Sequence, residues 1–375
     1  MKNTLLLSLS ILIVNISCAQ YFQEQDVFSG DYLEPYDFTQ FDGYLYYLGE
    51  DDEELVNASM YRTNGIIGNV AKQESSDGEV FNVRTIIGVY QGDLYFYGNL
   101  GDNPGELWKL PAPDQNPIQI TNTNDPEAEF FIPISSMRDV NGTLLFDLKI
   151  SEDVVDGYEL WTTDGTAEGT NLFLEINPEG DGFRNWLGEL NGIQYFVGNN
   201  GEDGRELWRT DGTVGGTFMV KDVNTLGNGV FGEGIIYDDR LYFSGVTPEN
   251  GGEIWSTDGT EEGTQLLIDL NEGPGDGPAF NPRFTLFNDR LFFVGSDGSA
   301  VGSEFWSTDG SSEGTELLAD LAEGDATILD PTVFNNRIYF RFQDPNLSEP
   351  RSLWATDGTE EGTLQIAPDA PIIAP

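Results

Sequence analysis

The sequence has no histidine, and its one cysteine, Cys18, lies in the apolar N-terminal segment. Without histidine there is no Ser-His-Asp or Cys-His nucleophile, no imidazole base and no histidine-ligated zinc or haem. Without a cysteine beyond Cys18 there is no disulfide framework, thiolate nucleophile or iron–sulfur site in the exported chain. These absences exclude the commonest catalytic and metal-binding machinery.

Basic residues are also scarce. The chain carries 17 Lys and Arg against 65 Asp and Glu, which gives a formal net charge of −48 over 375 residues. A surface of this sign repels phosphate groups, so we expect neither a nucleic acid nor an anionic membrane surface as a partner. What the chain has in abundance is glycine, 45 residues, and aromatics, with 24 Phe, 15 Tyr and 7 Trp. This composition favours a turn-rich all-β protein.

Residues 1–19 have the pattern of a signal peptide. Met1 and Lys2 give a basic start, and the apolar stretch from Leu5 to Ile16 is too short for a transmembrane span. The small residues before Gln20 predict cleavage there and export of the chain. The alternative is lipidation of Cys18, which requires an aliphatic residue three positions upstream, where Asn15 stands.

A repeated motif fills most of the remaining chain. Its clearest copy is Glu159-Leu-Trp-Thr-Thr-Asp-Gly-Thr-Ala-Glu-Gly-Thr170, and four more copies follow, with degenerate ones upstream. Its aromatic residue recurs at intervals of 47 to 53 residues, at Tyr61, Trp108, Trp161, Trp208, Trp255, Trp306 and Trp354. A period of this length is typical of β-propeller blades.

A second motif precedes each copy of the first. It is a short aromatic run such as Leu94-Tyr-Phe96, introduced by Asn, Asp or Gln paired with Gly, Asp or Asn, the signature of a tight hairpin turn. Two further apolar runs complete each unit, which therefore holds four strand candidates and no helical period. We predict a seven-bladed β-propeller, all-β, forming a single domain over residues 20–375, with its motifs running from Leu45 to Thr363.

The chain resembles the secreted bacterial proteins with ELWxxDGT repeats. The resemblance covers about residues 30–366, with five copies of the Thr-Asp-Gly core and linking segments such as Val220–Asn224. It implies a propeller-like, exported, surface-associated protein. It implies no reaction, because that family is defined by a repeat and not by an active site.

The Asp-Gly-Thr turn has two interpretations. In the structural one, the aspartate accepts local amide protons, glycine takes the positive φ and the threonine hydroxyls close the turn. In the functional one, the aspartates bind Ca²⁺, which needs more oxygen ligands than one carboxylate per turn provides. The sequence favours the structural interpretation. The aspartates concerned are Asp164, Asp211, Asp258, Asp309 and Asp357.

The repeated tryptophans are expected to pack between blades and not to form a sugar-binding platform, since they recur beside apolar residues at one position of the repeat. A glutamate stands two residues before five of these tryptophans, at Glu106, Glu159, Glu206, Glu253 and Glu304. Its repetition argues against catalysis, because a catalytic acid is needed only once. We expect the glutamate to be solvated or to form hydrogen bonds between blades.

The acidic loops are the candidate metal ligands, and the metal they would take is Ca²⁺. The alternative is that these loops only keep the surface soluble. The candidates are Glu50, Asp51, Asp52, Glu53 and Glu54 in one loop and Glu202 and Asp203 in another.

No catalytic motif is visible. The 65 acidic residues make a qualifying carboxylate pair inevitable, and the arginines are scattered without a sialidase motif. We therefore predict a non-enzymatic binding module, for a glycan or protein ligand at or outside the cell envelope, without catalytic residues or an organic cofactor. Two alternatives stay open: a propeller glycoside hydrolase or polysaccharide lyase using carboxylate, Tyr and Arg side chains, and a structural envelope or adhesion protein.

Overall fold

The computed structural model describes residues 35–50, 58–66, 69–74, 78, 81–100, 105–121, 137–149, 157–277, 282–298, 303–321, 326–344 and 351–367. The predicted signal peptide, Cys18 and the acidic run 51–54 lie outside these residues, as does the side chain of Glu50. The chain divides into two compact units, Met1–Leu174 and Glu175–Pro375.

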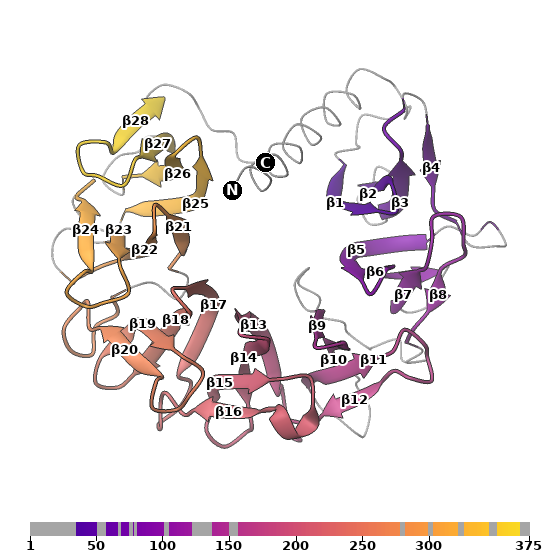
Figure 1. Cartoon of the computed structure of the whole chain (residues 1–375), viewed down its shortest axis with the longest axis horizontal. Coiled ribbons are helices and arrows are strands. Elements are labelled where there is room, and N and C mark those ends of the chain that lie inside the picture. Colours follow the sequence, from indigo (N-terminus) through magenta and orange to yellow (C-terminus); the bar gives the residue numbers. More distant parts are fainter. Residues whose placement is uncertain are drawn as a thin grey trace. The chain divides into compact units, whose positions relative to one another are not determined.

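The first unit holds three four-stranded sheets, which we call blades 1 to 3 (Figure 1). Blade 1 consists of β1 (Tyr36–Phe41), β2 (Tyr44–Glu50), β3 (Ala58–Thr63) and β4 (Val70–Lys72). Blade 2 consists of β5 (Phe81–Tyr90), β6 (Asp93–Leu100), β7 (Glu106–Leu110) and β8 (Ile118–Gln119). Blade 3 consists of β9 (Arg138–Val140), β10 (Thr143–Lys149), β11 (Tyr158–Thr163) and β12 (Asn171–Leu174).

The second unit holds four such sheets, blades 4 to 7. Blade 4 is β13 (Phe183–Leu190), β14 (Ile193–Asn199), β15 (Arg205–Thr210) and β16 (Phe218–Lys221), with a 3₁₀ turn, η1 (Val214–Gly216). Blade 5 is β17 (Val230–Tyr237), β18 (Arg240–Thr247), β19 (Gly251–Thr257) and β20 (Gln265–Ile268). Blade 6 is β21 (Thr285–Phe287), β22 (Arg290–Gly295), β23 (Glu304–Thr308) and β24 (Glu316–Ala319). Blade 7 is β25 (Thr327–Phe334), β26 (Arg337–Gln343), β27 (Ser352–Thr356) and β28 (Leu364–Ala367).

Every blade is an antiparallel meander in which each strand pairs with the next along the chain. The predicted fold class is therefore confirmed: the protein is all-β and is built from seven four-stranded propeller blades. No helix within the described ranges is long and apolar enough to cross a membrane.

The turn between the first two strands is the same in all seven blades. Both central residues have φ between 45° and 90°, as in the type I′ turn that suits the twist of a hairpin. Glycine, asparagine and aspartate tolerate this conformation best, which explains the dipeptides seen in the sequence. The turns are Asp42-Gly43, Gln91-Gly92, Asn141-Gly142, Asn191-Gly192, Asp238-Asp239, Asn288-Asp289 and Asn335-Asn336.

The cores lie between consecutive blades of a unit. One cluster joins Leu187 and Val197 of blade 4 to Leu241 and Phe243 of blade 5, and others join blades 1 and 2, 2 and 3, 5 and 6, and 6 and 7. A blade that is apolar on both faces is stable only between neighbours, because burial of those faces is the main favourable contribution to folding.

Candidate functional site

The motif aromatics all lie on the third strand of their blade, opposite an aromatic of the second strand. Trp208 pairs with Phe196 and Trp255 with Phe243, and the same register recurs in the other blades. Tyr61, Trp108 and Trp255 are buried, and Trp161, Trp208, Trp306 and Trp354 are half-buried. This arrangement suits packing better than an exposed sugar-binding platform.

A glycine two residues after that second-strand aromatic makes room for the indole. At Gly198 a Cβ atom would lie 2.7 Å from Cδ1 of Trp208, and at Gly245 it would collide with Trp255. In blade 2, Trp108 Nε1 donates to the carbonyl of Gly98 at 3.1 Å. These glycines were missed in the sequence, although their recurrence after five of the seven aromatic runs is visible there; blades 3 and 7 have Leu148 and Phe342 at this position.

The motif glutamates are buried: Glu159, Glu206, Glu253 and Glu304 have no exposed surface, and Glu106 is 3% exposed. The expectation of a solvated side chain is wrong for this position. Glu206 accepts from the amide of Val223 at 2.5 Å, and Glu253 accepts from Leu270 at 3.1 Å and from Asn271 at 3.2 Å. These amides lie in the segment that leads to the next blade, so the glutamate anchors the link between blades.

Burial has an electrostatic consequence for two of these glutamates. It raises the pKa of Glu206 to about 8, against an opposing effect of the amide donors, and that of Glu253 to about 7. Raised pKa values often mark catalytic acids, but here each carboxyl is enclosed and bound to its own backbone. We assign these groups a structural role.

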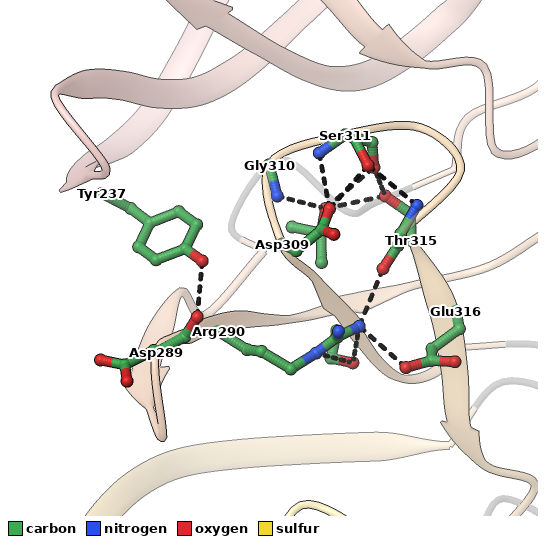
Figure 2. Close-up of polar contacts among 11 residues, drawn as sticks. Tyr237, Asp289, Arg290, Asp309, Gly310, Ser311, Thr315 and Glu316 are labelled. Atoms are coloured by element: carbon green, nitrogen blue, oxygen red, sulfur yellow. Dashed lines mark hydrogen bonds and ion pairs between the residues drawn. The ribbon is translucent and has the colours of Figure 1, made fainter.

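The Asp-Gly-Thr turn is closed by its own side chains, as Figure 2 shows for blade 6. Asp309 Oδ1 accepts from the amide of Ser311 at 3.0 Å and from its hydroxyl at 2.7 Å. The Ser311 hydroxyl accepts from the amide of Gly314, and Thr315 donates to the Ser311 carbonyl at 2.8 Å. Equivalent contacts surround Asp164, Asp211, Asp258 and Asp357. In all five, the hydrogen bond from the following hydroxyl is the main cause that lowers the aspartate pKa.

Three arginines brace these turns from the start of the second strand. Arg290 donates to the carbonyl of Gly314 at 2.8 Å and forms an ion pair with Glu316 at 2.8 Å (Figure 2). Arg240 donates to Gly263 and Arg337 to Gly362 in the same way. The polar groups of the repeat thus stabilise the fold, and a ligand site is expected among residues outside the repeat.

The acidic loop before β15 is one such place. Asp203 accepts from Asn200 Nδ2 at 2.7 Å, and the amides of Glu202 and Asp203 both donate to Asn200 Oδ1. Burial and then the charge of Asp203 raise the pKa of the half-buried Asp222, which places these two carboxylates near each other. Within the described ranges, no group of three or more acidic, His or Cys side chains is placed to hold a metal ion.

The first strands of the second unit are the other place where a ligand site is expected. In the second unit, β13, β17, β21 and β25 lie along one side of their sheets, opposite the fourth strands (Figure 1). Three of them have an irregular register, and in each strand a charged residue lies at one irregularity: Arg184 in β13, Glu233 in β17 and Asp330 in β25. Arg283 stands two residues before β21, beside Pro282, whose carbonyl accepts from the amide of Val294 at 2.7 Å. We call Arg184, Glu233, Arg283 and Asp330 the first-strand row.

The first-strand row is accessible to solvent. Arg184, Glu233 and Asp330 are exposed and Arg283 is half-buried. Asp330 forms an ion pair with Arg341 of the neighbouring strand β26. The signal in the sequence is a charged residue at the start of an otherwise apolar run, five to seven residues before the hairpin turn. It was missed because the position of a bulge depends on the pairing register.

Neither a protein-family model nor a characterised protein matches the chain by sequence. Solved structures resemble it at low identity. A puromycin-hydrolysing peptidase of Mycobacterium tuberculosis is 13% identical, with 89% of this chain and 52% of that one covered and a TM-score of 0.45. The β-propeller domain of the Trilobed protease from Pyrococcus furiosus is 12% identical, with 91% and 100% covered and a TM-score of 0.41. Prolyl oligopeptidase B from Galerina marginata is 12% identical, with 96% and 54% covered and a TM-score of 0.47.

The chain spans about half the length of the peptidases it matches, 52% and 54% in these two cases. At these identities and TM-scores the similarity carries no argument about activity.

Proposed function

We propose that the protein is an exported, non-enzymatic β-propeller that binds a glycan or protein ligand at or outside the cell envelope. The observation that carries the proposal is the first-strand row, which sets exposed charged side chains at irregular positions of an otherwise repetitive scaffold. In repeat proteins the shared positions build the scaffold, and departures from the repeat are free to serve recognition.

The contacts of the repeated polar residues support a binding role over a catalytic one. The motif aspartates are held by their own turns, and the contacts of Glu206 and Glu253 lead to backbone amides. A general acid or base has to reach a substrate, and an enclosed carboxyl that binds the backbone does not.

The proposal is tested with residues 20–375 on a glycan array and against cell-envelope extracts. We expect saturable binding to one glycan class or one envelope protein, and loss of that binding in the double variant Arg184→Gln/Glu233→Gln, measured where circular dichroism shows that the variant is folded. Absence of binding, or binding that the double variant retains, would overturn the proposal.

The second candidate is a glycoside hydrolase or polysaccharide lyase. One observation favours it: the same side of the second unit carries both arginines and carboxylates, the groups that such enzymes combine. We expect hydrolase and lyase assays on a broad glycan panel to stay at background. Turnover that is abolished by Glu233→Gln or Asp330→Asn would favour this candidate over the first.

A further inference from the structure

The chain contains six Asn-Gly pairs, and all of them lie in its described part. Asparagine is a chemically labile residue, and it is most labile before glycine. The glycine amide nitrogen attacks the asparagine Cγ atom, and glycine has no side chain to hinder the approach. The surroundings of each pair decide whether these two atoms can meet. The pairs begin at Asn64, Asn141, Asn191, Asn200, Asn228 and Asn250.

Three of the pairs are held through the groups that would react. Nδ2 of Asn200 donates to a carboxylate at 2.7 Å, and Nδ2 of Asn250 donates to another at 2.8 Å. In the third pair, the amide of Gly229 donates to the carbonyl of Arg205 at 2.8 Å. Either the leaving amide group or the attacking nitrogen is therefore fixed at each of these positions.

Two further pairs form hairpin turns. Asn141 has φ of 52° and Asn191 has φ of 54°, and the residues that flank each turn are paired with each other across the hairpin. The amide of Gly142 also donates to Asp139 Oδ1 at 2.8 Å. The strand pairing fixes the backbone of both dipeptides, which hinders the rotation that closure of a new ring requires.

The pair Asn64-Gly65 is held least. It lies between β3 and β4, outside the strand pairing, and both residues are exposed. The Asn64 side chain accepts from the amide of Ile66 at 3.2 Å, and its Nδ2 donates to no described residue. The amide of Gly65 donates to the Thr63 hydroxyl at 3.2 Å. Apart from the chain neighbours of Gly65, no described atom of the first unit lies within 4 Å of where its Cβ would stand.

Asn64 also has a defined position in the repeat. It stands where the five later turns carry their aspartate, because Thr63-Asn64-Gly65 aligns with Thr163-Asp164-Gly165. The contact is the same as well, since Asp164 Oδ1 accepts from the amide two residues further on at 2.9 Å. Blade 1 therefore keeps the start of this turn, with an amide in place of the carboxylate.

We propose that Asn64 deamidates spontaneously in the folded protein, ahead of the other five asparagines that precede glycine. The amide nitrogen of Gly65 bonds to Cγ of Asn64, the bond from Cγ to Nδ2 breaks, and ammonia leaves with the proton of the attacking nitrogen. Water then opens the resulting succinimide ring. Cleavage at Cγ gives aspartate at position 64, and cleavage at the backbone carbonyl gives isoaspartate.

The two products change the turn in different ways. Aspartate offers the Ile66 amide the same acceptor as Asn64 does, and it adds the negative charge that the later turns already carry. Isoaspartate inserts a methylene group into the backbone and moves the acceptor away from that amide. The turn between β3 and β4 is thus a place where the protein changes with age.

The experiment is peptide mapping by mass spectrometry after residues 20–375 have been kept at neutral pH for days. We expect the mass increase of an amide converted to a carboxyl at Asn64, in two products that chromatography separates, while Asn191 and Asn250 stay intact. In urea all six pairs should convert at similar rates, because unfolding removes the contacts that protect the other five. Asn64→Gln should abolish the early conversion, since its longer side chain does not form the five-membered ring.

The product is tested separately. Asn64→Asp should melt at the temperature of the unaltered chain or above it, because the carboxylate accepts from the same amide. Conversion of Asn141 or Asn191 ahead of Asn64, or equal conversion of all six pairs in the folded protein, would overturn the inference. A lower melting temperature of Asn64→Asp would contradict the equivalence of this turn with the aspartate turns of the repeat.

Discussion

Blades 4 and 5 differ at one loop position that interacts with a half-buried carboxyl. In both blades the position lies three residues before the buried glutamate, and Asp203 stands where blade 5 has Asn250. In blade 5, Asn250 Nδ2 donates to Asp269 at 2.8 Å. In blade 4 a carboxylate replaces that amide, and after burial the charge of Asp203 raises the pKa of Asp222.

The motif glutamates of both blades have an acidic neighbour. After burial, the main cause, the charge of Asp222 contributes to the rise in the pKa of Glu206 to about 8, and the charge of Asp269 contributes to the rise in the pKa of Glu253 to about 7. The residue that differs between the blades, Asp203 or Asn250, interacts with that acidic neighbour. The blades share a scaffold but not its electrostatics.

The largest effect we expect comes from the tryptophans of these two blades. Trp255→Ala should reduce the free energy of unfolding by about 3–5 kcal/mol, as for a large buried aromatic, since Trp255 is 8% exposed. Trp208→Ala should cost less, about 2–3 kcal/mol, because its indole is half-exposed. Urea denaturation measures both. Equal and small losses would mean that the indoles do not hold the blades together.

The next effect is a dependence of stability on pH. Unfolded glutamate loses its proton near its ordinary pKa of 4.5, whereas Glu206 keeps it in the folded protein up to about pH 8. The unfolded state therefore binds fewer protons between these values, so stability falls as pH rises, by up to about 1.4 kcal/mol per pH unit for one such group.

Glu206→Gln resembles the protonated form and should reduce that slope, and Glu253→Gln should reduce it over a window that ends nearer pH 7. Urea midpoints measured from pH 4.5 to 8.5 provide the test. If neither variant changes the slope, then the two carboxyls ionise at ordinary values and their burial is compensated by the amide donors.

Exchanging the differing residues of the two blades should have a smaller effect. Asn250→Asp removes the hydrogen bond to Asp269 and adds a like charge, so we expect a loss of about 1–2 kcal/mol. Asp203→Asn should gain about 0.5–1 kcal/mol by the reverse change. Thermal melts at pH 7.5 measure both changes. A destabilised Asp203→Asn variant would contradict an unfavourable interaction between the carboxylates of Asp203 and Asp222.

The hairpins and the blades could be predicted from the sequence because their causes are local. An Asn-Gly or Asp-Asp pair at a type I′ turn needs no distant partner, and seven repetitions of one pattern reveal the unit. The Asp309 turn could also be interpreted correctly, since its hydrogen bonds reach no farther than a few residues.

Features set by strand pairing could not be predicted. Glutamate is usually exposed, and the burial of Glu206 follows from amides 17 residues away that the fold brings to it. The bulge at Arg184 depends on how β13 and β14 align, and the meeting of Asp203 with Asp222 depends on two loops. The first-strand row could therefore be identified only from the pairing register of the first and second strands.

The smallest effect we expect is stabilisation by calcium, and it too depends on the difference between Asp203 in blade 4 and Asn250 in blade 5. Two facing carboxylates with few further ligands hold Ca²⁺ weakly, so millimolar concentrations should be needed. A cation bound only by the folded form raises the melting temperature beyond the screening that NaCl of equal ionic strength gives.

Two variants locate the ion. Asp203→Asn should lose the calcium-specific rise in melting temperature if the Asp203–Asp222 pair binds the ion, and a variant with amides at Asp51–Glu54 should lose it if that acidic run does. Melts in CaCl₂, MgCl₂ and NaCl, followed by EGTA, distinguish these cases. Equal shifts from CaCl₂ and matched NaCl would leave the acidic loops a role in solubility alone.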